Sequence, residues 1–107
     1  MSRMEFGLAT PQEIAREIGA RLRVQRLRQL FAQDELATRA GVSASALKTL
    51  ESTGKSTVET LMRVAGALGL QADFAQLFVP KDVSSIADLE RIERAQQRRR
   101  APRRKST

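Results

Sequence analysis

The segment QDELATRAGVSASALKTLES, residues 33–52, contains two short helical patterns that meet at a single break. The apolar positions of both patterns follow helical spacing and are Leu36, Ala37, Ala40, Leu47 and Leu50. Gly41 interrupts them and can adopt the positive φ that ends a helix, while Ser43 is a good N-cap for the second pattern. The segment therefore predicts a helix over 33–40, a tight turn, and a second helix from 44 to about 52.

Two helices joined in this way form a helix-turn-helix unit, whose second helix has the diameter that a DNA major groove accepts. The side chains on the outer face of the helix starting at Ala44 are then candidate base-reading residues: Ala44, Ser45, Lys48 and Thr49. The alanine methyl suits thymine, the two hydroxyls can donate or accept at base edges, and the lysine can reach guanine or a phosphate. The alternative is that these four form the solvated face of an ordinary surface helix.

A longer helix is expected before this segment, from residue 11 to about 29 or 30. Thr10, Pro11 and Glu13 give a strong helix start, with Thr10 and Glu13 as the two partners of a capping box. The apolar stripe predicted along this helix comprises Ile14, Ile18, Leu22, Leu27, Leu30 and Phe31. Residues 1–10 show no clear period and are predicted to be an N-terminal arm.

Three further helical patterns follow residue 52. Ser56 and Glu59 are expected to cap a helix that Gly69 ends, and a short helix is expected over 73–78, covering the core with Phe74, Leu77 and Phe78. A last pattern begins at Ser85, with Asp88 as capping partner, runs through Arg94 or beyond, and carries Ile86, Leu89 and Ile92 on one face. No strand pattern competes. We therefore expect an all-α fold, with a five-helix domain over 11–79 and a C-terminal extension over 80–107 that contains a sixth helix.

Composition favours a small binding module over an enzyme. The chain has 107 residues, no cysteine and no histidine, which excludes thiolate metal sites and removes the commonest metal ligand and general base. The acidic residues are dispersed, and no glycine-rich phosphate loop occurs. We expect no catalytic site, metal or cofactor. The lack of an apolar run of membrane-spanning length or of a secretory signal favours a cytoplasmic protein.

The net charge of +7 lies in the C-terminal part of the chain. Residues 1–90 contain eleven Lys or Arg and eleven Asp or Glu, whereas residues 91–107 contain eight Lys or Arg and one acid. The run RRRAPRRK is self-repelling and lacks large apolar side chains, which predicts a disordered basic tail. Three interpretations of the extension are open: it contacts DNA phosphates, its Ile86, Leu89 and Ile92 dock a protein partner or a second copy, or it only aids solubility.

The stretch from Ile18 to Leu70 resembles the Xre family, the Cro and lambda-repressor type of helix-turn-helix domain. The matching positions are Ile18, Leu22, Arg26, Leu27, Gln33, Glu35, Leu36, Ala37, Ala40, Gly41, Val42, Ser43, Leu47, Leu50, Glu51, Leu61, Ala65, Leu68, Gly69 and Leu70. The resemblance implies five helices around the motif and a homodimer on palindromic double-stranded DNA. Ala32, Leu30 and Gln25 depart from the family, which more often has Ser or Thr, glycine and leucine there.

Further roles follow from the residues and from this resemblance. Gln33 opens the helix over 33–40, where its amide and the free backbone N–H groups can hold a phosphate, or it is simply a polar first-turn residue. The resemblance implies backbone contacts near the turn after the second motif helix, and the candidate set is Gln33, Arg39, Ser43, Ser52, Thr53, Lys55 and Ser56. Arg39 fits a solvated surface charge as well as it fits a phosphate contact. The resemblance also pairs Glu51 with Arg26 as a structural ion pair.

Two functions are therefore expected. The first is a sequence-specific DNA-binding transcriptional regulator, a repressor. The second is an antitoxin similar to the HipB-like proteins, which would neutralise a toxin such as a HipA-like kinase and also repress its own operon. RNA binding is disfavoured because the chain has no Tyr or Trp and its four Phe residues are mostly expected in the core.

Overall fold

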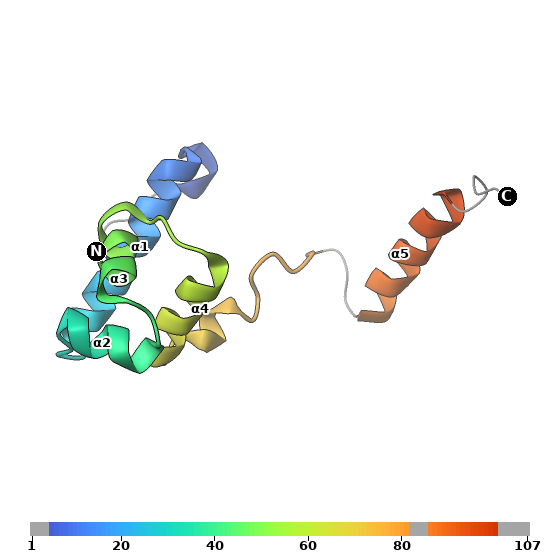
Figure 1. Cartoon of the computed structure of the whole chain (residues 1–107). Coiled ribbons are helices and arrows are strands. Elements are labelled where there is room, and N and C mark those ends of the chain that lie inside the picture. The colour runs from blue at the N-terminus through green and yellow to red at the C-terminus, as the bar shows by residue number, and fades with distance from the viewer. Residues whose placement is uncertain (1–4, 82–85, 101–107) are drawn as a thin grey trace, which may run out of the picture. The chain divides into compact units, whose positions relative to one another are not determined.

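The computed structural model describes residues 5–81 and 86–100, which form five α-helices, two short 3-10 helices and no strand (Figure 1). The elements are η1 (Phe6–Leu8), α1 (Pro11–Arg28), α2 (Gln33–Ala40), α3 (Ala44–Thr53), α4 (Val58–Ala67), η2 (Gln71–Phe74) and α5 (Ile86–Arg100). The all-α fold is thereby confirmed. The chain divides into two units, Met1–Ala75 and Gln76–Thr107, so the first unit ends before the boundary expected at 79.

The start of α1 follows the sequence prediction. The Thr10 hydroxyl accepts a hydrogen bond from the Glu13 backbone N–H at 3.1 Å, and the Glu13 carboxylate accepts one from the Thr10 N–H at 2.9 Å. Pro11 occupies the first helical position, where a missing N–H has no consequence. The predicted capping box is therefore present.

The end of α1 differs from the predicted apolar stripe. The Phe31 N–H bonds to the Arg26 carbonyl at 3.1 Å, which closes a Schellman turn, and Leu30 takes the left-handed conformation with φ of 65°. Leu27 and Leu30 are exposed, so the prediction that they continue the stripe is wrong. Arg26 lies on the inner side instead, four residues after the buried Leu22.

The segment 33–52 has the expected helix bounds, except that α3 extends one residue further, to Thr53. Gly41 ends α2 with φ of 72°, and the Ser43 hydroxyl accepts a hydrogen bond from the Ala46 N–H at 2.9 Å. Ala32 provides no side-chain cap for α2, yet the Glu35 carboxylate accepts from the Ala32 N–H at 3.4 Å. The helix therefore begins at Gln33 without the usual hydroxyl.

The core joins the first four helices and is formed by Leu22, Leu36, Ala37, Ala40, Leu47, Leu50, Val64, Ala65 and Leu68. α3 packs against α1 along much of its length. A Cβ added at Gly19 would lie 2.1 Å from the Leu50 carbonyl oxygen, and one added at Gly54 would lie 2.1 Å from the Ala15 carbonyl oxygen. These two glycines permit the backbones of α1 and α3 to approach each other closely.

The cap predicted for α4 is wrong. Thr57, not Ser56, is the N-cap, and its hydroxyl accepts from the Thr60 N–H at 3.0 Å. The Ser56 hydroxyl donates to the Thr57 carbonyl at 2.8 Å, and Glu59 forms an ion pair with Arg63 at 2.8 Å. Ser56 is one residue too early because the helix starts at Val58.

The helix predicted over 73–78 is also wrong, so the described part of the first unit holds four α-helices and two 3-10 helices rather than five helices. Hydrogen bonds from the Asp73 N–H to the Leu70 carbonyl and from the Ala75 N–H to the Ala72 carbonyl have 3-10 spacing. Phe74 packs against the core, but Leu77 and Phe78 are exposed, the latter at φ of 60°. Without burial of these side chains, so short a segment has little to stabilise an α-helix.

The C-terminal unit contains α5, which runs to Arg100 and so agrees with the expectation of a helix through Arg94 or beyond. Its first turn carries Asp88, and the Arg91 guanidinium forms an ion pair with Asp88 at 2.8 Å. Because the helix continues to Arg100, the prediction of a disordered basic tail over the run RRRAPRRK is wrong over 98–100. The remainder of that tail, 101–107, and the predicted cap Ser85 lie outside the described residues.

Candidate nucleic-acid interface

The outer face of α3 carries all four candidate base-reading side chains. Ala44, Ser45, Lys48 and Thr49 are exposed, while Leu47, Leu50 and Glu51 on the inner face are buried. The two sets lie on opposite sides because an α-helix turns once in about 3.6 residues. The buried set fixes the helix on the core, so the exposed set is held out on a rigid support.

The polar members of this face have no partner among the described residues. In the part of the chain that the structure describes, the side chains of Ser45, Lys48 and Thr49 make no hydrogen bond or ion pair. Two hydroxyls and one ammonium group are therefore available to an external partner. Side chains of these types can contact base edges and phosphates.

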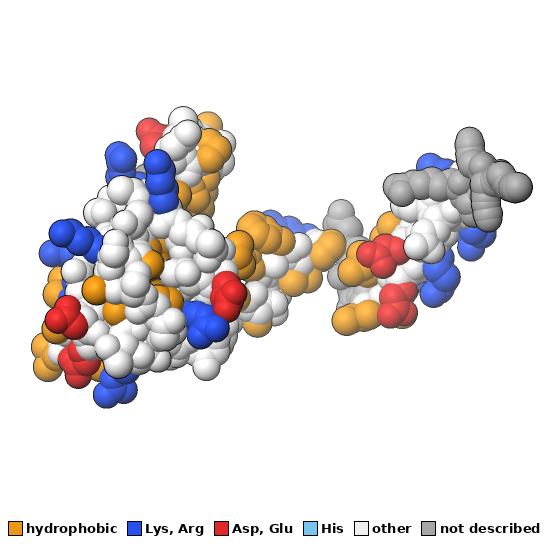
Figure 2. Space-filling view, viewed as in Figure 1, with side chains coloured by type: hydrophobic (Ala, Val, Ile, Leu, Met, Phe, Trp, Pro, Cys, Tyr) orange, Lys and Arg blue, Asp and Glu red, His pale blue; other side chains and the backbone are white. Residues whose placement is uncertain are grey.

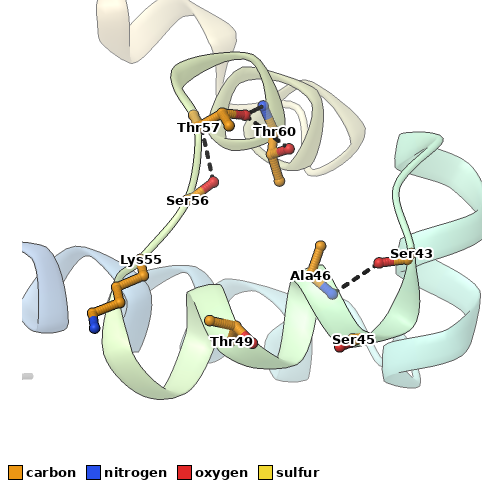
Figure 3. A pocket seen from close by; sticks show the side chains of 8 residues that line it. All are labelled: Ser43, Ser45, Ala46, Thr49, Lys55, Ser56, Thr57 and Thr60. Atoms are coloured by element: carbon orange, nitrogen blue, oxygen red, sulfur yellow. Dashed lines mark hydrogen bonds between the residues drawn. The ribbon is translucent and has the colours of Figure 1, made fainter.

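A broad surface hollow lies between α3 and the start of α4. It has a volume of about 470 Å³ and is lined by Ser43, Ser45, Ala46, Thr49, Lys55, Ser56, Thr57 and Thr60. Figure 3 shows Ser43 at the start of α3, followed by Ser45, Ala46 and Thr49 along the helix. Across the hollow lie Ser56 and Thr57 on the connection to α4, and Thr60 on α4 itself. The lining contains five of the predicted contact residues and no acidic side chain. A polyanion at this surface would meet hydroxyls and one lysine without a repelling carboxylate in the lining.

Sequence reasoning missed Ala46, Thr57 and Thr60 in this lining. The signal for Thr57 was present, because a threonine followed three residues later by Thr60 at a helix start is compatible with an N-cap. The Ser56–Glu59 pair also fits the capping pattern, and the prediction followed that pair.

The residues predicted to contact the DNA backbone differ in whether their hydrogen-bond donors are still free. The hydroxyls of Ser52, Thr53 and Ser56 already donate to the carbonyls of Lys48, Thr49 and Thr57, at 2.9, 2.8 and 2.8 Å respectively. Phosphate oxygens accept hydrogen bonds, so these three hydroxyls would need to rotate before they could bind one.

Ser43 and Lys55 are better placed as donors. The Ser43 oxygen accepts from Ala46 and leaves its own proton available, and the Lys55 ammonium has no acidic partner among the described residues. The geometry thus favours these two of the predicted set as phosphate contacts.

Arg26 and Glu51, which the family resemblance pairs, form a buried bidentate ion pair. Arg26 Nε and Nη2 donate to the two Glu51 oxygens at 2.7 and 3.0 Å, and Arg26 Nη1 donates to the Phe31 carbonyl at 2.8 Å. The hydrogen bonds that Arg26 donates to Glu51 raise the pKa of Arg26 against the opposing effect of burial. Arg26 thus remains charged, and the pair connects α1, α3 and the connection to α2.

Gln33 joins this buried pair. Its side-chain amide donates to Glu51 Oε1 at 3.0 Å, so one of the amide protons expected to face a phosphate is used inside the protein. The contact anchors the start of α2 to α3. Arg39, the weaker candidate, lies over the Phe31 ring with its guanidinium carbon 4.8 Å from the ring centroid.

Charge is not concentrated on the first unit. Residues 5–75 contain nine Lys or Arg and eight Asp or Glu, and Figure 2 shows their side chains scattered over the visible face. Three of the cations are paired with acids, as Arg21–Glu17, Arg26–Glu51 and Arg63–Glu59. Any attraction of this unit to a polyanion is therefore short-ranged.

Two searches of the described residues bear on other kinds of site. Within 5–81 and 86–100, no group of three or more acidic side chains is arranged to hold a metal ion. None of the helices in these ranges combines the length and hydropathy needed to cross a membrane.

Comparisons with known proteins give no further assignment. No protein-family model matches this chain, and no curated protein matches it significantly.

Proposed function

We propose that this chain is a sequence-specific DNA-binding transcriptional regulator of the Xre type, in which α2 and α3 form the helix-turn-helix motif and α3 enters the major groove. In this proposal it is a repressor that acts in the bacterial cytoplasm as a homodimer. The single observation that carries the proposal is the outer face of α3, where Ser45, Lys48 and Thr49 are exposed and unpartnered within the described residues while the opposite face is anchored in the core.

The hollow beside this face supports the same function. Ser43 and Lys55 flank the reading face with a free hydroxyl proton and a free ammonium group, both suited to phosphate oxygens. Contacts of that kind would fix the register of α3 on the duplex, and Ser45, Lys48 and Thr49 would then choose the sequence.

The test is selection of bound duplexes from a random pool by the full chain and by the double variant S45A/K48A. We expect the full chain to enrich a two-fold symmetric consensus, with half-sites about one helical turn apart, and the variant to lose or change that consensus. The matched control is Q12A/R23A, which removes an amide and a cation from exposed positions on α1. If folded S45A/K48A enriches the same consensus as the full chain, the proposal is wrong.

A second candidate is the antitoxin. It is favoured by the exposed apolar residues of α5, since Ile86 is 71% exposed and Leu89 and Ile92 are also exposed. The antitoxin function would be supported if the full chain neutralises a toxin encoded beside its gene and the variant I86D/L89D does not. An unchanged neutralising activity of that variant would remove α5 from this role.

A further inference from the structure

The two halves of α5 differ in composition. The acidic residues Asp88, Glu90 and Glu93 and the apolar Ile86, Leu89 and Ile92 lie in its first half. From Arg94 onward the helix contains only Arg, Gln and one Ala. Figure 2 shows this division, with red and orange side chains near the start of α5 and blue ones farther along.

Three arginines of the second half have no acidic partner among the described residues. Arg91 is paired with Asp88, but within the described part of the chain Arg94, Arg98 and Arg99 make no ion pair or side-chain hydrogen bond, and all three are exposed. Arg94 and Arg98 are four residues apart and therefore share one face of the helix. The protein thus holds a helical stripe of unneutralised guanidinium groups.

The distribution of charge indicates what this stripe is for. Residues 5–75, which include the whole α3 face, have a net charge of only +1, from nine cations and eight acids. Residues 94–107 contain seven Lys or Arg and no acid, which equals the net charge of the entire chain. A protein that binds DNA gains most of its salt-dependent affinity from cations that replace the counterions of phosphates. The first unit is poor in such cations.

We propose that α5 is a second DNA-binding element, in which Arg94 and Arg98 contact phosphates of the duplex without sequence preference and supply affinity that the α3 face lacks. Their four-residue separation is about 6 Å along the helix axis, and each DNA strand offers a phosphate about every 3.4 Å of its axis. The two guanidinium groups can therefore engage different phosphates. This inference rests on the proposed function only for the division of roles between α3 and α5.

A nucleic acid fits this stripe better than a membrane surface does. A helix that lies in a membrane interface needs apolar side chains opposite its cations along the same length. α5 has its large apolar residues in the first half, beside three acids, and none beside Arg94 and Arg98. The arginine half can therefore bind phosphates but cannot also insert an apolar face.

The experiment measures binding of the full chain to a duplex of random sequence at several KCl concentrations. We expect R94Q/R98Q to bind more weakly and to lower the slope of log affinity against log salt by about 1.8, since each phosphate contact contributes about 0.9. R94K/R98K, which keeps both charges, should retain the parental slope within about 0.5. The matched control R16Q/R23Q removes two exposed cations from α1 and should leave the slope unchanged.

Several outcomes would overturn the inference. These are an unchanged slope for R94Q/R98Q, an equal fall for R16Q/R23Q, or binding of the full chain to anionic phospholipid vesicles that is as tight as to DNA and lost in R94Q/R98Q. Circular dichroism checks that α5 remains helical, because Gln and Arg have similar helix propensities.

A different measurement tests the proposed function, namely the sequence of the selected duplexes. If S45A/K48A selects the same duplexes as the parent while R94Q/R98Q lowers the salt slope, α3 does not read sequence but α5 binds DNA. If S45A/K48A changes the selected sequence and R94Q/R98Q has the parental slope, the proposed function survives and the role of α5 does not.

Discussion

The two sides of α3 differ in what their polar groups contact. On the inner side, Glu51 accepts three hydrogen bonds, two from Arg26 and one from Gln33, in surroundings that exclude water. On the outer side, the side chains of Ser45 and Lys48 make no hydrogen bond or ion pair with any described residue. The difference indicates that one face of the helix carries stabilising contacts while the other leaves its polar groups open to an external partner. Substitutions on the two faces should therefore have separable effects.

The largest effect on stability is expected from Glu51→Ala. The change leaves Arg26 charged and unpaired in the core, and breaking a buried pair in this way lowers the free energy of unfolding by about 3–5 kcal/mol. Denaturant titration measures it. Glu59→Ala is the matched control, because the Glu59–Arg63 pair is exposed and should contribute at most about 1 kcal/mol. Equal losses for the two variants would contradict the structural role of the buried pair.

The next effect concerns the side of α3 that faces α1. Gly19→Ala would place a Cβ against the Leu50 carbonyl, and we expect a loss of about 1–3 kcal/mol from the forced separation of the two backbones. The control substitution is expected to raise the free energy of unfolding instead. Gly66 lies within α4 with no atom within 4 Å of an added Cβ, so Gly66→Ala should stabilise by about 0.5–1 kcal/mol. Thermal melting of both variants checks the prediction, and a stable Gly19→Ala variant would refute it.

A smaller effect is expected at the start of α3. Ser43→Ala removes the hydroxyl that accepts from the Ala46 N–H and should lower stability by about 1 kcal/mol. Ala32→Ser should act in the opposite direction at α2, whose N-cap lacks a side-chain acceptor. Melting temperatures of the two variants should therefore move apart around that of the parent. Movement in the same direction would contradict this account of the two caps.

The smallest stability effect belongs to the outer face. S45A/K48A should change the free energy of unfolding by less than about 0.5 kcal/mol, because neither side chain has a partner to lose within the described residues. Denaturant titration of this double variant completes the comparison. A loss comparable to that of Glu51→Ala would mean that the outer face is structural, and would remove the distinction between the two sides.

Much of the first unit could be predicted from its sequence. The bounds of α2 and the starts of α1 and α3 follow from apolar spacing and from Thr10, Gly41 and Ser43, whose roles are local. The buried positions Leu36, Leu47 and Leu50 follow from the same spacing. In these elements the local sequence signals agree with the tertiary packing, so the helices could be predicted without knowledge of the residues packed against them.

The errors arise where tertiary contacts or a competing local signal decide. Leu27 and Leu30 have helical spacing, yet Arg26 takes the inner position because Glu51 lies opposite, a fact of three-dimensional packing. Leu77 and Phe78 are apolar but exposed, so composition alone suggested a helix over 73–78 that no burial supports. In α5 the prediction of disorder weighed charge repulsion but not the favourable placement of acids early and arginines late in a helix.

For the candidate site, the sequence identified residue types but not their hydrogen-bond states. Ser52, Thr53 and Ser56 were indistinguishable from Ser43 as hydroxyl donors until the structure showed which protons are already used. Gln33 similarly has one amide proton committed to Glu51, a contact that spans 18 residues of sequence. Such assignments depend on relative orientation, which spacing alone does not give.

The left-handed conformation of Leu30 has a practical consequence for engineering. A residue with a Cβ in this conformation is disfavoured by about 1–2 kcal/mol, and this leucine side chain is almost fully exposed, at 88%. Glycine at this position would remove that penalty at a site on the α1–α2 connection, away from the outer face of α3. The substitution could therefore offset a loss of stability caused by new side chains on that face.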